Sequence, residues 1–266
     1  MTAATLTSTS STASPTSRVL ALAATEAKLV LRNRTVAVSS ILMPLALGIF
    51  WAFSFGGRDA PPGAGAIVAA LQLGVVLSMG IYVTATQILV ARRHSRVLKR
   101  MRTTGLSDRG LLVATVAPSV VLGFGQLVVL AVFGAVTRTA VPVDAVPLVL
   151  AVVGGIVLAV TAALATSVVT PSPERSQITT LPLTFVLLGG AVATSVIPLT
   201  IAPLQALAFV PGAAVGQLVQ LAMTGATWPP GFAGIPMVVP ALVGLVLWSV
   251  VFGLLAARNF RWDPRR

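Results

Sequence analysis

The chain contains no cysteine and only one histidine, His94, among its 266 residues. Without thiols it can form no disulfide and perform no thiol chemistry, and a conventional zinc site lacks its ligands. Neither lysine follows a glycine, which excludes the P-loop pattern G-x-x-x-x-G-K-[ST], and no G-x-S-x-G motif occurs. We therefore expect no catalytic residues, no metal site and no directly bound cofactor.

Charged residues are also scarce, at 9% of the chain, whereas a soluble domain carries about 25%. The six acidic residues fall in expected loops or near the chain ends: Glu26, Asp59, Asp108, Asp144, Glu174 and Asp263. Paired carboxylates for acid–base work are not seen inside any apolar stretch. Ion-coupled carriers usually hold such groups within their spans, so this alternative is disfavoured. A membrane-embedded enzyme or a membrane anchor is a further alternative, and the former is weakened by the same absence.

Long apolar segments make up most of the chain, which is 56% hydrophobic with a mean hydropathy of +0.97. Several runs reach 20 residues or more, enough for a helix to cross a hydrocarbon core of about 30 Å. We predict an all-α polytopic membrane protein with six transmembrane helices. Their approximate ranges are 35–55, 64–91, 110–136, 147–169, 178–197 and 236–257.

The net charge of +12 is distributed unevenly among the expected loops. Six spans place sixteen of the eighteen Lys and Arg residues on one side and leave Arg58 and Arg138 on the other. The positive-inside rule then predicts a multi-pass protein of the cytoplasmic membrane with both termini in the cytoplasm. Lys and Arg also favour anionic membrane lipid, and no aromatic residues are interleaved with them as in nucleic-acid-binding proteins. We expect lipid contact and no nucleic-acid partner.

Two regions flank or interrupt the six spans. Residues 1–17 are mostly Ser, Thr and Ala and are expected to form a disordered tail. Residues 18–33 predict an N-terminal amphipathic helix that lies in the membrane interface, with its basic residues Arg18, Lys28 and Arg32 on one face. An ordinary helical lead-in to the first span is an equally good interpretation. Residues 198–235 are apolar but interrupted by five prolines, which predicts short re-entrant or interfacial helices before the last span.

The spans carry only mildly polar side chains. Either they hydrogen-bond between helices, which is the commoner role, or they form a weakly polar path for an amphiphilic substrate. The candidate path residues are Gln72, Ser78, Thr84, Gln126, Thr184, Thr194 and Ser195. Small residues recur every four positions in the fourth span and predict a close helix-packing face: Ala151, Gly155, Ala159, Ala163 and Ser167.

The stretch RRHSRVLKRMRTTGLSDRG, residues 92–110, holds seven of the basic residues. Its apolar residues cluster on one side of a short basic helix, Gly105 is a natural helix stop, and Ser107 is a credible N-cap for the third span. The helix could determine topology, bind anionic lipid or dock a cytoplasmic partner. Exposed Val97, Leu98 and Met101 favour the third interpretation.

The segment RRHSRVLKRMRTTGLSDRGLLVATVAPSVVLGFGQLVVL resembles the loop and following helix of ABC type-2 transporter permeases of the daunorubicin-resistance exporter class. That class commonly shows Gly-x-Leu-Lys-Arg-Leu-Arg, a small pair and Pro-Leu, which residues 97–104 and Leu106 follow closely. His94 stands where the family often has Glu, Arg96 where it has Gly, and Gly105 where it has Pro. The resemblance extends over residues 18–260, leaving 261–266 as a basic cytoplasmic tail.

The resemblance implies a permease subunit without ATPase activity of its own. It implies a second permease copy, in a homodimer or heterodimer, and separate cytoplasmic ABC ATPase subunits that hold ATP and Mg. The expected function is export of a hydrophobic or amphiphilic compound: a drug, an antibiotic, a lipid or a glycan. The expected ATPase-contact residues are Arg96, Val97, Leu98, Lys99, Arg100, Met101 and Arg102.

Overall fold

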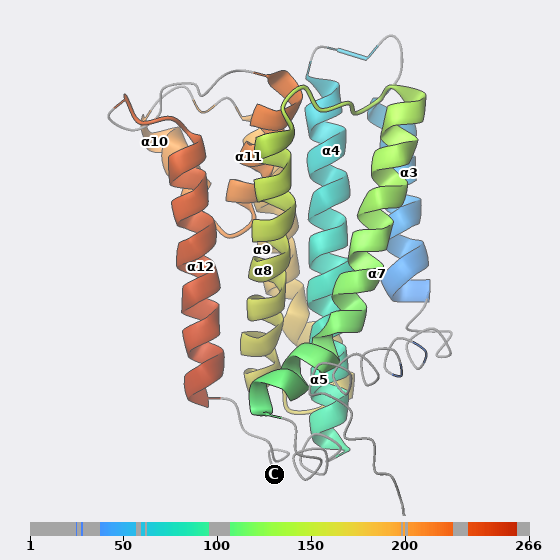
Figure 1. Ribbon diagram of the computed structural model, residues 1–266, viewed down its shortest axis with the longest axis vertical. Helices are drawn as coiled ribbons and strands as arrows, with labels where there is room; N and C mark the ends of the chain where they lie inside the picture. Colours follow the sequence, from blue (N-terminus) through green and yellow to red (C-terminus); the bar gives the residue numbers. More distant parts are fainter. Residues whose placement is uncertain are drawn as a thin grey trace, which may run out of the picture.

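The computed structural model describes residues 25, 28, 38–56, 60–61, 63–95, 107–197, 199, 202–225 and 234–259. Within these residues the chain forms a bundle of long, roughly parallel helices (Figure 1). Five of the helices are long and apolar enough to cross a membrane: Ala64–His94, Asp108–Thr137, Ala145–Val169, Pro173–Val196 and Val238–Asn259. The chain is therefore a helical, multi-pass membrane protein, as its composition predicted.

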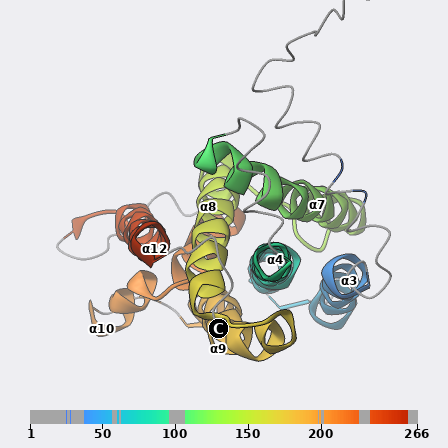
Figure 2. The same ribbon diagram turned by 90° about the horizontal axis from the view of Figure 1, so that it is seen from below.

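The centre of the bundle is one continuous helix made of α4 (Ala64–Val75), the π-helical segment η2 (Val76–Val83) and α5 (Thr84–His94). Its most apolar stretch is 83% buried, whereas that of α7 is 22% buried. The helices α3 (Met43–Phe55), α7 (Asp108–Thr137), α8 (Ala145–Val169) and α9 (Pro173–Val196) all pack against it. In the end-on view α4 lies between α3, α7, α8 and α9 (Figure 2). An apolar helix enclosed by protein on most sides forms the core, while its neighbours face lipid.

The last long helix, α12 (Val238–Asn259), lies at the edge of the bundle. It packs mainly on α8, and more lightly on α11 (Ala213–Thr224). The predicted small-residue face of α8 is buried, with Ala151, Ala159 and Ala163 at most 1% exposed. This confirms the prediction of a close packing face.

Two short helical elements precede α11: α10 (Ala202–Gln205) and the 3-10 turn η4 (Ala206–Phe209). The chain then reverses at Gly212, whose φ of 87° is in the left-handed region that favours glycine, and α11 begins. Nearly the whole of α11 is buried against α4, α8, α9 and α12. The predicted short helices before the last span are thus present, and the longer one belongs to the core of the bundle.

Capping groups define several helix ends. The side chain of Ser107 accepts a hydrogen bond from the backbone N–H of Gly110 at 3.1 Å, which confirms its predicted role at the start of α7. Asp144 caps α8 in the same way through the N–H of Val146. Pro118 lies inside α7, which bends toward its N-terminal end in Figure 1; a proline removes one backbone donor and is a common cause of such a bend.

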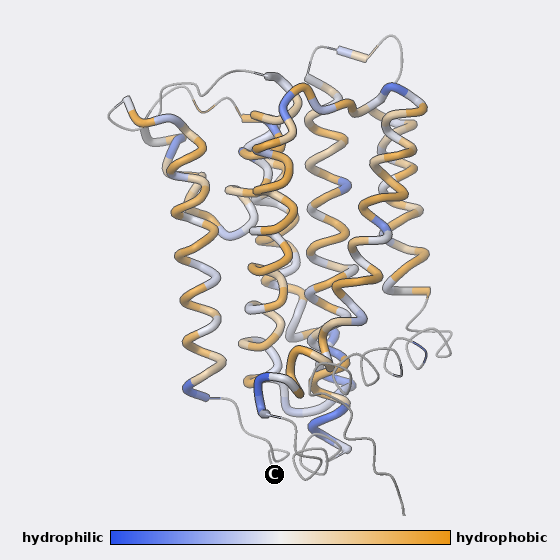
Figure 3. Tube along the Cα trace, in the orientation of Figure 1, coloured by the Kyte–Doolittle hydropathy of each residue, from blue (hydrophilic) through white to orange (hydrophobic). Residues whose placement is uncertain are grey.

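The two ends of the bundle differ in charge (Figure 3). One end, called the basic end below, is where α5 and α12 finish and where α7 and α9 begin; its described arginines are Arg92, Arg93, Arg109, Arg175 and Arg258. The opposite, low-charge end carries the loop 138–144 between α7 and α8. This asymmetry agrees with the charge distribution that the sequence predicted.

Some predicted boundaries shift. The helix α9 begins at Pro173 rather than near residue 178, and α8 begins at Ala145 rather than near 147. Among the described residues, the first predicted span, 35–55, contains the shorter apolar helix Ser40–Phe55, and five helices meet the length of a membrane span. The sixth span stays a prediction. Most of the predicted interfacial helix, including Arg18 and Arg32, lies outside the described residues; Lys28 is helical and exposed.

Candidate functional site

The candidate path residues are all buried within the bundle. Four of them hydrogen-bond to a carbonyl of their own helix, mostly one turn earlier: Ser78 to Gly74, Thr84 to Met79, Thr184 to Thr180 and Ser195 to Ala191. A hydroxyl satisfied in this way is tolerated inside a membrane without a partner helix. These four side chains therefore need no substrate to account for their polarity.

The other three candidates connect different helices. The amide of Gln72 donates to the Gly48 carbonyl at 3.1 Å, and that of Gln126 donates to the Ser40 carbonyl at 2.7 Å. The hydroxyl of Thr194 donates to the Ala213 carbonyl at 2.9 Å and so joins α9 to α11. This is the helix–helix role that the sequence left open beside a substrate path. The structure does not bring the seven residues together around one cavity, and whether they line a path stays a prediction.

Thr194 offers a test of this structural role. Replacing Thr194 with Val should lower the free energy of unfolding by about 1 kcal/mol, because it removes the hydrogen bond that joins α9 to α11. Replacing Thr184 with Val should change it by no more than about 0.5 kcal/mol, because that hydroxyl bonds only within α9. Unfolding of the purified protein in detergent mixtures measures both. Equal losses for the two variants would contradict a special role for Thr194.

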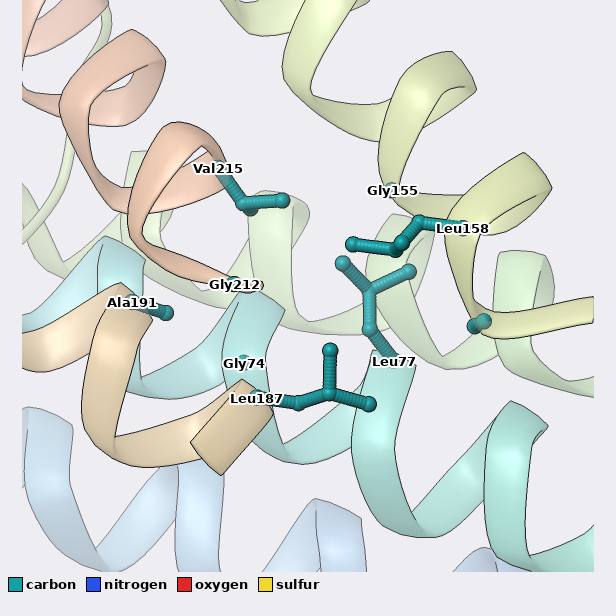
Figure 4. A pocket seen from close by; sticks show the side chains of 9 residues that line it. Gly74, Leu77, Gly155, Leu158, Leu187, Ala191, Gly212 and Val215 are labelled. Atoms are coloured by element: carbon teal, nitrogen blue, oxygen red, sulfur yellow. The ribbon is translucent and has the colours of Figure 1, made fainter. Parts of the chain in front are cut away.

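A small apolar cavity lies where α4, η2, α8, α9 and α11 meet (Figure 4). Gly74, Gly155 and Gly212 line it, and Leu77, Leu158 and Leu187 fill most of the space between them. The volume of the cavity is only about 10 Å³. This volume is at the lower limit for one water molecule, and the lining offers no polar side chain to hold it. The cavity is a close-packed junction of helices and not a substrate site.

The glycines of this junction allow the helices to approach closely. A Cβ atom on Gly155 would lie 2.4 Å from a methyl carbon of Leu77, and one on Gly216 would lie 1.9 Å from the carbonyl oxygen of Ala191. Gly216 therefore lets the backbones of α9 and α11 approach closely. Gly212, four residues earlier, makes a similar approach, since its Cβ would lie 2.1 Å from the carbonyl oxygen of Leu187.

At the basic end, Arg93 joins two spans. Its guanidinium is 3% exposed and donates to the carbonyl of Ser167 at 2.7 Å and to the carbonyl of Thr170. Both carbonyls belong to the C-terminal end of α8, where helix carbonyls lack intrahelical donors and the helix dipole favours a cation. The side chain thus fastens the end of α5 to the end of α8, a short distance before residues 96–102.

Sequence reasoning counted Arg93 only as one more loop charge and missed this role. The signal was present in the helical register: Tyr82, Thr86, Leu89 and Arg93 follow a 4-3-4 spacing on one helix face, and all four are buried. The same face makes a second contact with α8, a hydrogen bond of 3.0 Å between the hydroxyls of Tyr82 and Thr166. An arginine at the end of a span that lies on the buried face of its helix is therefore a candidate to cap the C-terminal end of a neighbouring helix.

The predicted ATPase-contact residues, 96–102, lie outside the described part of the chain, as does Gly105. The structure describes what surrounds them on both sides. The helix α5 runs continuously to His94, and α7 begins at Asp108 after the Ser107 cap. The contact of residues 96–102 with an ATPase stays a prediction.

Comparison with known proteins gives one family. No curated protein is similar enough to the chain to be matched. Residues 34–258 match the family described as ABC-2 family transporter protein, and this range takes in every long helix of the bundle. With most of its length matched, and with the apolar helices that a membrane transporter requires, the chain belongs to the ABC-2 family of transporter proteins.

Proposed function

We propose that the chain is the permease subunit of an ATP-driven exporter. The observation that carries this proposal is the family match over residues 34–258, which covers the whole helical bundle. Its five long apolar helices supply the membrane part of such a transporter. A sixth span formed by the Ser40–Phe55 helix and the residues before it would return both termini to one side.

The energy for transport would come from a separate cytoplasmic ABC ATPase, which binds ATP and Mg. The sequence supports this division of labour because it lacks a P-loop and carries no paired carboxylates within its spans. We place the basic end of the bundle in the cytoplasm of a cytoplasmic-membrane protein, following the positive-inside rule. Residues 96–102 then lie where the ATPase would dock, and the interfacial helix with Arg18, Lys28 and Arg32 would lie beside them.

A transporter of this kind is expected to contain two permease domains, either two copies of this chain or this chain with a related one. The substrate class that fits the apolar bundle is a hydrophobic or amphiphilic compound, such as a drug, an antibiotic, a lipid or a glycan. The buried polar residues from Gln72 to Ser195 are the mildly polar groups available to such a substrate, besides the hydrogen bonds that they make within and between helices.

Docking of the ATPase can be tested by co-purification. The permease is co-expressed with an ABC-type ATPase of the same genome, and Arg96, Lys99, Arg100 and Arg102 are replaced together by Glu. We expect at least a tenfold loss of bound ATPase, because the reversed charges repel the surface that the wild-type residues attract. ATP hydrolysis of the reconstituted complex should lose its stimulation by substrate to the same degree.

The matched control is a charge reversal elsewhere at the same end, Arg258→Glu in the last turn of α12. It should leave both the complex and its ATPase activity unchanged. Retention of the ATPase by the quadruple variant, with the permease folded, would show that these residues do not dock it.

A further inference from the structure

Helices α7 and α8 follow each other along the chain but hardly touch. Toward the low-charge end they diverge, and α4 lies between them (Figure 1). The result is a groove of about 240 Å³ with α7 and α8 as walls and α4 as its floor. Its lining is almost wholly apolar, with Phe124 and Val128 on one wall, Val152 on the other and Leu73 in the floor. Gln72 is the polar exception, and its amide nitrogen already donates to Gly48.

The position of the groove indicates what fills it. Both walls are helices long and apolar enough to span a membrane, and the groove is open to their surroundings, so lipid hydrocarbon can enter it. Water is a poor occupant because the lining has too few polar partners. Along α7 the lining runs from Phe124 to Ala135, a rise of about 16 Å. This is about half of a 30 Å hydrocarbon core and fits one acyl chain of one leaflet.

The mouth of the groove, at the low-charge end, is formed by the loop 138–144, with Ala140 and Pro142 in the lining. This loop is held at two points. Thr139 packs against Gly56 and Gly65, where any Cβ atom would lie within 3 Å of it. The backbone N–H groups of Val143 and Asp144 both donate to the Ala222 carbonyl at the end of α11, at 2.8 and 3.0 Å. The mouth is therefore preformed.

Two opposite charges stand at the two ends of the loop 138–144 that forms this mouth. Arg138 ends α7 in the left-handed conformation, with φ of 56°, and its side chain is exposed. Asp144 begins α8 and uses one carboxylate oxygen to cap the N–H of Val146, which leaves acceptor capacity on the other oxygen. Within the described part of the chain neither residue takes part in an ion pair. A guanidinium recognises phosphate, and a carboxylate recognises a primary ammonium.

We propose that the groove between α7 and α8 is a binding site for a phospholipid of the phosphatidylethanolamine class. One acyl chain lies along Phe124 and Val128, the phosphate contacts Arg138, and the ammonium contacts Asp144. In the orientation proposed above, the lipid belongs to the outer leaflet. The site depends on membrane insertion of the bundle and not on transport, so loss of the proposed exporter function would leave it standing.

Native mass spectrometry of the delipidated protein in mild detergent tests the site. Dioleoyl phosphatidylethanolamine, phosphatidylcholine and phosphatidylglycerol are titrated separately, and the dissociation constant of the first bound lipid is measured. We expect phosphatidylethanolamine to bind about fivefold more tightly than either other lipid, because one exposed charged contact distinguishes it from each. Choline has no N–H to donate to Asp144, and the glycerol headgroup has no cation.

Substitutions at the mouth and in the groove separate this site from general lipid contact. Arg138→Gln should weaken binding of all three lipids about fivefold, since all carry the phosphate. Asp144→Asn keeps a good helix cap and should abolish only the preference for phosphatidylethanolamine. Ala131→Phe places a ring in the groove and should eliminate the first tight lipid. Its neighbour Val132, which is exposed and outside the lining, gives the matched control Val132→Phe with unchanged binding.

Three results would overturn the proposal, and the first two need no variant. If the wild-type protein bound the three lipids with equal affinity, the bound lipid would be nonspecific annular lipid and not a lipid held in a specific site. Tightest binding of phosphatidylglycerol would refute the role of Asp144. Equal effects of Ala131→Phe and Val132→Phe on lipid binding would refute the groove as the site. As a further control, Arg175→Gln at the basic end should leave the dissociation constants of all three lipids unchanged.

Discussion

Replacement of Arg93 with Met is expected to destabilise the protein by about 3 kcal/mol. The substitution keeps a long side chain but removes the two donors that satisfy the Ser167 and Thr170 carbonyls, both buried at the end of α8. An unsatisfied buried acceptor costs about 1–3 kcal/mol, and the favourable interaction with the helix dipole is lost as well. Denaturation of the detergent-solubilised protein, followed by circular dichroism, gives the change.

Two further variants identify the cause. Arg93→Lys keeps the charge but not the planar fork, so it should recover part of the loss and remain less stable than the wild type. Arg109→Met removes an exposed arginine at the same end and should change the stability by no more than about 0.5 kcal/mol. If Arg93→Met were as stable as Arg109→Met, the guanidinium would not be holding α5 to α8.

Replacement of Gly216 with Ala should cost about 3 kcal/mol or more, although it adds a single methyl group. The new Cβ would lie 1.9 Å from the Ala191 carbonyl oxygen and 2.5 Å from the Thr194 hydroxyl oxygen. The first of these is backbone of α9 and cannot rotate away, so α11 must move as a unit. Because α11 is buried against four other helices, this movement would disturb the core. Thermal unfolding and the yield of monodisperse protein measure the effect.

A glycine on the facing helix supplies the control. Gly189 of α9 has no atom within 4 Å of where its Cβ would be, so Gly189→Ala meets open space. It should be neutral or stabilising by up to about 1 kcal/mol, because alanine has the higher helix propensity. A Gly216→Ala variant as stable as Gly189→Ala would mean that α9 and α11 are not in close contact.

Much of the fold follows from local sequence rules. The helical, multi-pass architecture came from the length and apolar character of the runs, because a chain in lipid must satisfy its backbone hydrogen bonds within each helix. Ser107 was predicted as a cap from its place before an apolar run, and the packing face of α8 from its four-residue spacing. The prolines of residues 198–235 indicated short helices there. Each of these features depends on residues that are close in the sequence, so it can be predicted from one segment of the chain without knowing the fold.

Other features depend on which segments meet in space. The register of Arg93 can be read from the sequence, but its partners cannot, since they are backbone carbonyls of α8 more than 70 residues away. The same holds for Gly216 against Ala191. The prolines predicted short re-entrant or interfacial helices in residues 198–235, whereas packing places α11 in the core of the bundle. The role of residues 96–102 in contacting an ATPase is implied by the family resemblance and stays a prediction.

The sequence by itself determined that the chain is a helical membrane protein, the approximate ranges of its five long apolar helices, and that its charge lies mostly at one end. Apolar length, proline and capping residues act locally, and so they needed no fold. Only the tertiary structure decided that α4, η2 and α5 form the buried centre and that α7 and α8 part to leave a groove. Those arrangements arise from contacts between side chains and backbone of distant segments, which no local pattern specifies.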